Sequence, residues 1–178
     1  MENLKFRRGV TLVEVMMVLG VMAFLLGIIM QLASSVHDSS RSSELVTEVD
    51  VIHEIAKNLV SSSPGSQGCC SGPEIHGTGE LPSRYWDAKN EVMVTPNGGL
   101  IDPHAISNGL FLIWVRGLTT NECVALATTS WGPGQTNLNV NNIGDYGAGT
   151  WPGPQATQWC ASQPSGQSYV AIGWNLAY

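Results

Sequence analysis

The stretch Gly9-Val10-Thr11-Leu12-Val13-Glu14-Val15 joins a short basic leader, residues 1–9, to a long apolar segment. This apolar segment continues to Leu32, and Glu14 is its one charged residue. A bilayer has a hydrocarbon core of roughly 30 Å, which about 20 apolar helical residues can cross. The segment is long enough, so we predict a membrane-spanning helix over residues 10–33.

The carboxylate of Glu14 is costly inside a membrane, and an acidic residue in such a segment marks a functional site whose partner has to be found. That partner is not in the apolar segment itself. Lys5, Arg7 and Arg8 precede the segment. Basic residues on one side favour a cytoplasmic amino terminus, so we expect the rest of the chain to lie outside the membrane.

A basic leader that ends in Gly, followed by Thr-Leu-x-Glu and a long apolar helix, resembles the class III signal sequence of type IV pilins and pseudopilins. Residues 11–22, with Gly27 and Leu32-Ala33 beyond them, are similar to the type IVb group, such as the toxin-coregulated and bundle-forming pilins. Unlike many type IVa pilins, the segment starts with Val10 rather than Phe, and the nine-residue leader is shorter than most type IVb leaders.

The resemblance implies that a prepilin peptidase cleaves after Gly9 and that the amine of Val10 becomes the mature, N-methylated terminus. Glu14 would then neutralise the terminal amine of a neighbouring subunit, which favours docking of the helices in one register. An ordinary secretory signal would instead have a shorter apolar core and an Ala-x-Ala-like site after it. Residues 33–35 match that pattern only weakly.

The second part of the helix is predicted from periodicity over residues 34–60. Apolar residues recur there at intervals of four, three, four and three, which is the spacing of one helical face: Leu45, Val49, Ile52, Ala56 and Leu59. Polar residues, among them Glu44 and Glu48, are expected to cover the remaining surface. We predict one helix over residues 10–60, about 75 Å long, with an apolar first half and an amphipathic second half.

Residues 61–178 are predicted to form one globular head domain, because 178 residues leave room for one modest core beside the helix. Residues 61–109 are expected to be a long irregular connection with one short strand at 91–95. Strands are predicted at residues 109–116 and 169–176, a short N-capped helix at 118–128, and a loop with one strand near 136–140 after it. The fold class is α+β. A long amino-terminal helix, half protruding and half amphipathic, packs on an antiparallel sheet, as in pilins.

Four cysteines in an extracytoplasmic chain predict disulfides. The resemblance implies that Cys123 and Cys160 pair and bracket a C-terminal disulfide-bonded region. Cys69 and Cys70 are adjacent, and a bond between neighbouring residues is geometrically awkward. Crossed pairing with the other two cysteines, or free thiols, are therefore the expected alternatives.

Composition excludes several kinds of function. The net charge is -6, and without the leader five Lys/Arg face thirteen Asp/Glu, which argues against binding nucleic acid through a basic surface. His53-Glu54 lacks the second histidine of a zinc-protease motif, and the four histidines are expected to be dispersed surface residues. We predict no catalysis, metal or cofactor. The six tryptophans are expected to be core or loop anchors, with a glycan- or receptor-contact role as the alternative for Trp131 and Trp151.

The expected function is that of a structural subunit of a type IV pilus. It would be made as an inner-membrane precursor and polymerised with copies of itself into an extracellular filament for adhesion or aggregation. Expected partners are prepilin peptidase, the inner-membrane pilus assembly machinery and a possible host-cell receptor. The alternatives are a minor pilin or type II secretion pseudopilin, and a carbohydrate- or DNA-binding filament component.

Overall fold

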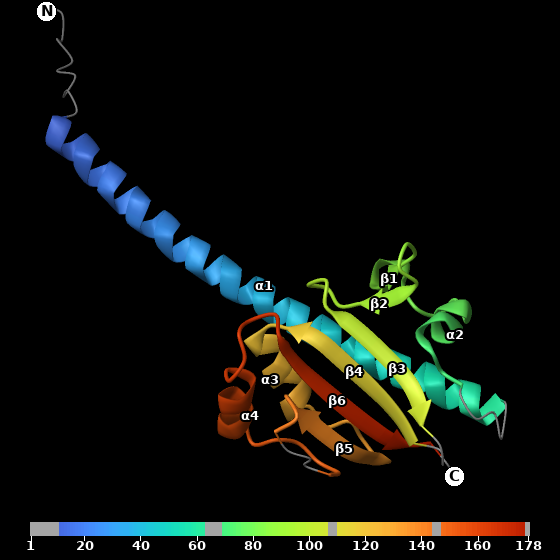
Figure 1. Cartoon of the computed structure of the whole chain (residues 1–178). Coiled ribbons are helices and arrows are strands. Elements are labelled where there is room, and N and C mark those ends of the chain that lie inside the picture. The colour runs from blue at the N-terminus through green and yellow to red at the C-terminus, as the bar shows by residue number, and fades with distance from the viewer. Residues whose placement is uncertain (1–10, 63–68, 107–109, 144–146, 177–178) are drawn as a thin grey trace, which may run out of the picture. The chain divides into compact units, whose positions relative to one another are not determined.

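The computed structural model describes residues 11–62, 69–106, 110–143 and 147–176 (Figure 1). Contacts within the chain divide it into two compact units, Met1–Asp38 and Ser39–Tyr178. Each unit is considered by itself below.

Helix α1 (Leu12–Ser62) has 51 residues and confirms the prediction of one helix over residues 10–60. In the first unit its large apolar side chains are exposed, and Leu12–Met30 is a 19-residue segment long and apolar enough to cross a membrane. In the second unit α1 is amphipathic, because one face buries the predicted apolar residues: Leu45, Val49, Ile52 and Ala56 are fully buried.

The second unit contains a six-stranded, fully antiparallel sheet in the order β1-β2-β3-β4-β6-β5. Its strands are β1 (Trp86–Asp87), β2 (Val92–Val94), β3 (Leu100–Ile106), β4 (Leu110–Leu118), β5 (Gln135–Val140) and β6 (Ser168–Asn175). The central pair β4 and β6 is in register from Leu110↔Asn175 to Arg116↔Tyr169. The predicted antiparallel sheet and its two main strands are therefore confirmed.

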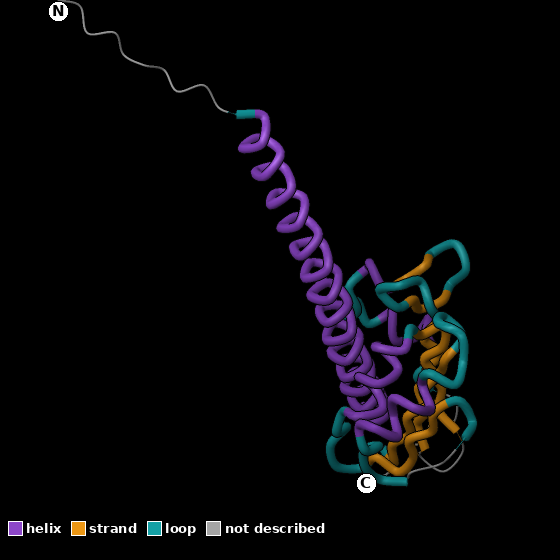
Figure 2. Tube along the Cα trace, turned by 90° about the vertical axis from the view of Figure 1, so that its left-hand side faces the viewer, coloured by secondary structure: helices purple, strands orange, loops and turns teal. Residues whose placement is uncertain are grey.

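Four short helical elements complete the second unit: α2 (Gly72–Gly77), a 3-10 helix (Ser83–Tyr85), α3 (Thr120–Thr128) and α4 (Gly153–Cys160). Thr119 caps α3, as the sequence predicted. Figure 2 shows the strands as one layer with helical segments along one side of it.

One hydrophobic core lies between the second-unit part of α1 and the sheet. Alternate side chains of the central strands point into it, as the two-residue period of a strand requires: Phe111, Ile113 and Val115 from β4, and Val170, Ile172 and Trp174 from β6. The inward faces of α3 and α4 extend this core through Leu126, Ala127 and Ala156. The sheet and helices thus give the C-terminal cysteines a rigid support.

The prediction of one irregular connection over residues 61–109 is wrong, because α2, β1 and β3 form within it in addition to the expected short strand. Pro103 lies inside β3 and had argued against a strand there. Strand β2 pairs only with Leu100 and Ile101, so one edge of β3 is unpaired within the sheet from Asp102 onward. A proline lacks the backbone N–H donor, and such an edge tolerates it.

Helix α4 was also not predicted. It starts directly after Pro152, and Pro154 occupies its first turn. The high density of Pro and Gly predicted a loop. A proline is tolerated in the first turn of a helix, however, because the N–H group that it lacks would have no partner within the helix.

Candidate functional site

The first described turn of α1 is built around Thr11 and Glu14. The backbone N–H of Glu14 donates both to the carbonyl oxygen of Thr11, at 3.0 Å, and to its hydroxyl oxygen, at 3.3 Å. Thr11 therefore caps the helix, in the Thr-x-x-Glu spacing of a capping box. Gly9 and Val10, the predicted cleavage and methylation positions, lie outside the described residues.

Glu14 is exposed, and it is the one Asp, Glu, Lys or Arg between Thr11 and Val36. Its neighbours Val13 and Val15 are also exposed, at 66% and 45%. A carboxylate in the first turn is favoured by the positive end of the helix dipole. Within an apolar surface, this carboxylate can form an ion pair with a cation from outside the chain. Such an ion pair is what the sequence predicted for Glu14.

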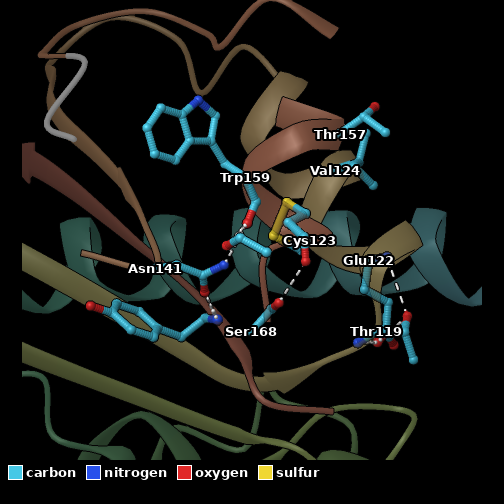
Figure 3. The surroundings of a disulfide bond; sticks show 12 residues. Thr119, Glu122, Cys123, Val124, Asn141, Thr157, Trp159 and Ser168 are labelled. Carbon is cyan, nitrogen blue, oxygen red and sulfur yellow. Dashed lines mark hydrogen bonds between the residues drawn. A yellow bond between two sulfur atoms is a disulfide. The ribbon is translucent and has the colours of Figure 1, made fainter. Parts of the chain in front are cut away.

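The disulfide-bonded region is the second part of the site. The structure joins Cys123 of α3 to Cys160 of α4, with their Cα atoms 5.8 Å apart and both residues fully buried (Figure 3). This is the pairing that the resemblance implied. It connects two short helices that the sequence separates by the whole of β5 and its flanking loops.

Hydrogen bonds fix the end of α4 to the last two strands (Figure 3). The side-chain amide of Asn141 donates to the carbonyl oxygen of Trp159 at 2.9 Å, and its side-chain oxygen accepts from the N–H of Tyr169 at 2.8 Å. The hydroxyl of Ser168 donates to the carbonyl oxygen of Cys160 at 3.0 Å. The disulfide therefore lies in a region whose backbone is held on both sides.

A series of side-chain hydrogen bonds connects α1 to the start of α3. Arg41 donates to the side-chain oxygen of Asn97, and the amide of Asn97 donates to Glu122, both at 2.5 Å. The other carboxylate oxygen of Glu122 accepts from the N–H and the hydroxyl of Thr119. Glu122 is 1% exposed, so these contacts satisfy a buried carboxylate, as such groups require.

Cys69 and Cys70 form a disulfide with each other. The expected crossed pairing and the expected free thiols are both wrong. Cys70 has a φ of 78°, an uncommon backbone conformation for a residue other than glycine. One residue in the left-handed region thus accompanies the bond between neighbouring positions.

Comparisons with known proteins agree with these features. The chain is 28% identical over 147 residues to a protein described as the major structural subunit of bundle-forming pilus from Escherichia coli O127:H6 (strain E2348/69 / EPEC), covering 80% of this chain and 75% of that protein. The protein of the same description from Escherichia coli O111:H- is 28% identical over 154 residues, with 82% and 79% covered. No family model matches the chain.

Among solved structures, the fold is similar to the crystal structure of a type IV b pilin from Salmonella typhi. The TM-score is 0.60 at 15% sequence identity, and the match covers 75% of this chain and 99% of that one. In sequence the chain is similar to major subunits of bundle-forming pilus, and in fold it is similar to a type IVb pilin. The long helix, the antiparallel sheet and the C-terminal disulfide described above agree with the predicted pilin fold.

Three of the tryptophans, Trp131, Trp151 and Trp174, are buried members of the core. Trp131 and Trp151 are 5% and 7% exposed, and their indole N–H groups donate to the carbonyl oxygens of Leu126 and Leu138. The alternative of a glycan or receptor contact through these two rings is therefore wrong. The prediction of surface histidines also fails for His53, which is buried and stacks on Trp174 with ring centroids 4.4 Å apart.

A group of polar residues beside α1 was missed. Arg84 forms an ion pair with Glu44, with 2.8 Å between its Nη2 and Oε1, and the hydroxyl of Tyr85 donates to the same oxygen at 2.6 Å. Burial, followed by the hydrogen bond to Glu44, raises the pKa of Tyr85 to about 12. Glu48 lies one helical turn after Glu44.

Glu48 was expected on the polar surface of the helix, but it is 3% exposed. Burial and, to a smaller extent, the negative charge of Glu44 raise the pKa of its carboxyl to about 9, and the charge of Arg84 opposes the shift. No periodicity could have marked this residue, because the segment that covers it is Leu81–Tyr85, more than 30 residues further along the chain.

Proposed function

We propose that this pilin is the major structural subunit of a type IV pilus, inserted in the inner membrane as a precursor and then polymerised with copies of itself into an extracellular filament. The observation that carries the proposal is helix α1. Its Leu12–Met30 segment exposes apolar side chains and carries a single carboxylate, Glu14, in its first turn. Such a helix needs a lipid or protein environment on all sides, and a bundle of identical helices supplies one.

The proposed maturation has two steps. Prepilin peptidase cleaves between Gly9 and Val10, and the new amine of Val10 is N-methylated. Glu14 of one subunit then pairs with the terminal amine of the next during assembly by the inner-membrane machinery. An isolated carboxylate is costly in an apolar environment, so the pair favours only the register in which charge is neutralised. A host-cell receptor is a further proposed partner.

The proposal is tested by the conservative variant Glu14→Gln, which keeps the shape of the side chain and removes its charge. We expect normal cleavage and membrane insertion but loss of surface filaments, measured by immunoblotting of sheared filaments and by mass spectrometry of the amino terminus. Gly9→Val is the reference for an uncleaved chain, and its terminus should not start at Val10.

Two controls separate the possible results. Glu54→Gln removes an exposed carboxylate from the head-domain part of the same helix and should leave filaments unchanged. Normal piliation by Glu14→Gln would refute the assembly role of this residue. A pilin that is present in sheared filaments only in trace amounts would instead be a minor pilin or a pseudopilin.

A further inference from the structure

A cavity of about 320 Å³ lies beside α1 in the second unit. One wall is a face of α1 with Glu44, Glu48 and Val51, and the other is the segment from Leu81 to Tyr85. Its lining combines the carboxyls of Glu44 and Glu48 and the guanidinium of Arg84 with hydroxyl-bearing and apolar side chains. This composition is unlike the apolar core on the sheet side of the same helix.

Glu48 is the unusual member of the wall. It is 3% exposed, and neither of its carboxyl oxygens has a hydrogen-bond partner among the described residues. The nearby cation, Arg84, is held by Glu44, and the hydroxyl of Tyr85 also donates to Glu44. A buried polar group without a partner is destabilising by about 1 to 3 kcal/mol. Glu48 is one of the residues that line the cavity, from which a partner can come.

The lining restricts what that partner can be. Glu44 is paired with Arg84, which also lines the cavity, so the carboxyl of Glu48 is the lining acid without a counterion and favours a cation over an anion. No group of three potential metal ligands occurs in the described part of the chain. The cavity is also far larger than a metal ion, and Val51, Leu81 and Pro82 offer an apolar surface to a hydrocarbon chain. A cationic head on an aliphatic stem fits both the charge and the walls.

We propose that this cavity binds a primary alkylammonium group, with its nitrogen at the carboxylate of Glu48 and its stem along Val51, Leu81 and Pro82. The ammonium can come from a free amine or from a lysine side chain of a second copy of the pilin. Only the second source rests on the proposed filament function.

The chain has one lysine suited to the second source. Arg41, Arg84 and Arg116 contact Asn97, Glu44 and Asp102, and Lys57 contacts Glu54. Lys89 lies in the exposed turn between β1 and β2, and no ion pair of its ammonium occurs among the described residues. The turn presents this side chain to solvent, where another copy can receive it.

Binding must move a proton. The charged and titratable groups around Glu48 are Glu44, Arg84 and Tyr85, and burial keeps the pKa of Glu48 at about 9. Its carboxyl is therefore protonated at pH 7, and an arriving ammonium displaces this proton to solvent. Up to one proton is released for each amine bound, and the affinity increases as the pH rises toward 9.

The free-amine arm uses the full chain in non-ionic detergent and isothermal titration with butylammonium chloride, in two buffers of different ionisation enthalpy. We expect saturable binding with proton release, and no comparable binding of butanol, which has the same stem without the charge. Glu48→Gln should weaken binding at least tenfold, while Glu54→Gln should leave it unchanged. Circular dichroism checks that both variants are folded, and proton release is measured on the unaltered protein.

The second arm detects a lysine donor. Sheared filaments are treated with a carbodiimide, which couples a carboxyl directly to an amine in contact with it, and are analysed by mass spectrometry. A Glu48–Lys89 cross-link that is absent in Lys89→Gln identifies the neighbouring copy as the source. Butylammonium binding without the cross-link identifies a free amine. The absence of both, or equal butylammonium binding by Glu48→Gln, would overturn the proposal, whether or not filaments form.

Discussion

At the scale of single residues, helix α1 carries two carboxyls in unusual surroundings, Glu14 and Glu48. Glu14 is exposed in an apolar segment, and Glu48 is buried beside the head domain. Each is unfavourable in the isolated chain for a different reason. In the proposed filament Glu14 would be removed from water, whereas burial holds Glu48 in its neutral form. Both positions favour a cation supplied from outside the chain.

Glu48 gives the stability of the head domain a specific pH dependence. Its carboxyl has a pKa of about 9 in the folded chain, against an ordinary value of 4.5 for glutamate. Between these values the folded state holds a proton that the unfolded state lacks, so stability falls as the pH rises, by up to about 1.4 kcal/mol per pH unit. Glu48→Gln removes this dependence. Between pH 5 and pH 8, we expect the free energy of unfolding of wild type to fall by about 2 to 4 kcal/mol relative to that of Glu48→Gln.

Urea titrations at the two pH values, in the absence of amines, measure this difference. The matched change Glu54→Gln removes an exposed carboxylate from the same helix and should show no such trend. Parallel pH profiles for wild type and Glu48→Gln would show that Glu48 is ionised in the folded chain.

At the scale of elements, the two disulfides are expected to stabilise the folded state by different amounts, because they close loops of different length. Cys123–Cys160 has a sequence separation of 37 and connects α3 to α4, whereas Cys69–Cys70 joins neighbours. In the chain-entropy model, a crosslink stabilises by restricting the unfolded chain, and the effect increases with loop length. A bond between adjacent residues closes almost no loop.

We therefore expect Cys123→Ala/Cys160→Ala to lower the free energy of unfolding by about 4 kcal/mol. Cys69→Ala/Cys70→Ala should cost clearly less, and most of that loss should come from the buried side chain of Cys70. Thermal or urea unfolding of the two double variants measures both effects. Equal losses would contradict the loop-length explanation.

Elements with a strong local pattern could be predicted from the sequence, and those that depend on their neighbours could not. Helix α1 and strands β4 and β6 follow from apolar periodicity. Strand β3 was missed because Pro103 is tolerated only where β2 has already ended. Helix α2 had a usable signal that was overlooked, since Ser71 and Glu74 form a capping box with the Ser-x-x-Glu spacing.

The candidate site divides in the same way. Glu14, Cys123 and Cys160 were predicted because local sequence and the resemblance to pilins mark them. The burial of Glu48 depends on the segment Leu81–Tyr85, and the stacking of His53 depends on Trp174 in the last strand. Helical periodicity assigns a face to each of these side chains but contains no information on which distant segment covers it.

At the scale of the whole molecule, the two units have different environments. The buried core belongs entirely to the second unit, from Leu45 to Leu176, while the first unit exposes its apolar side chains. The second unit therefore has what an independent domain needs, and the first needs a membrane or other copies.

We expect a fragment of residues 39–178 to fold and remain monomeric in the absence of detergent, whereas the full chain should be recovered with membranes. Circular dichroism and light scattering after size-exclusion chromatography test the fragment, and membrane flotation tests the full chain. A fragment that is unfolded or aggregated would show that residues before 39 contribute to the fold of the head domain.

The strand order also has a consequence for biosynthesis. The last strand made, β6, lies between β4 and β5, and β5 has no other partner in the sheet. The sheet of the described residues stays incomplete until β6 has been synthesised. A chain that is released early lacks the strand that joins β4 to β5 and supplies Trp174 to the core. Completion of the head domain therefore requires translation through Asn175, the last residue of β6.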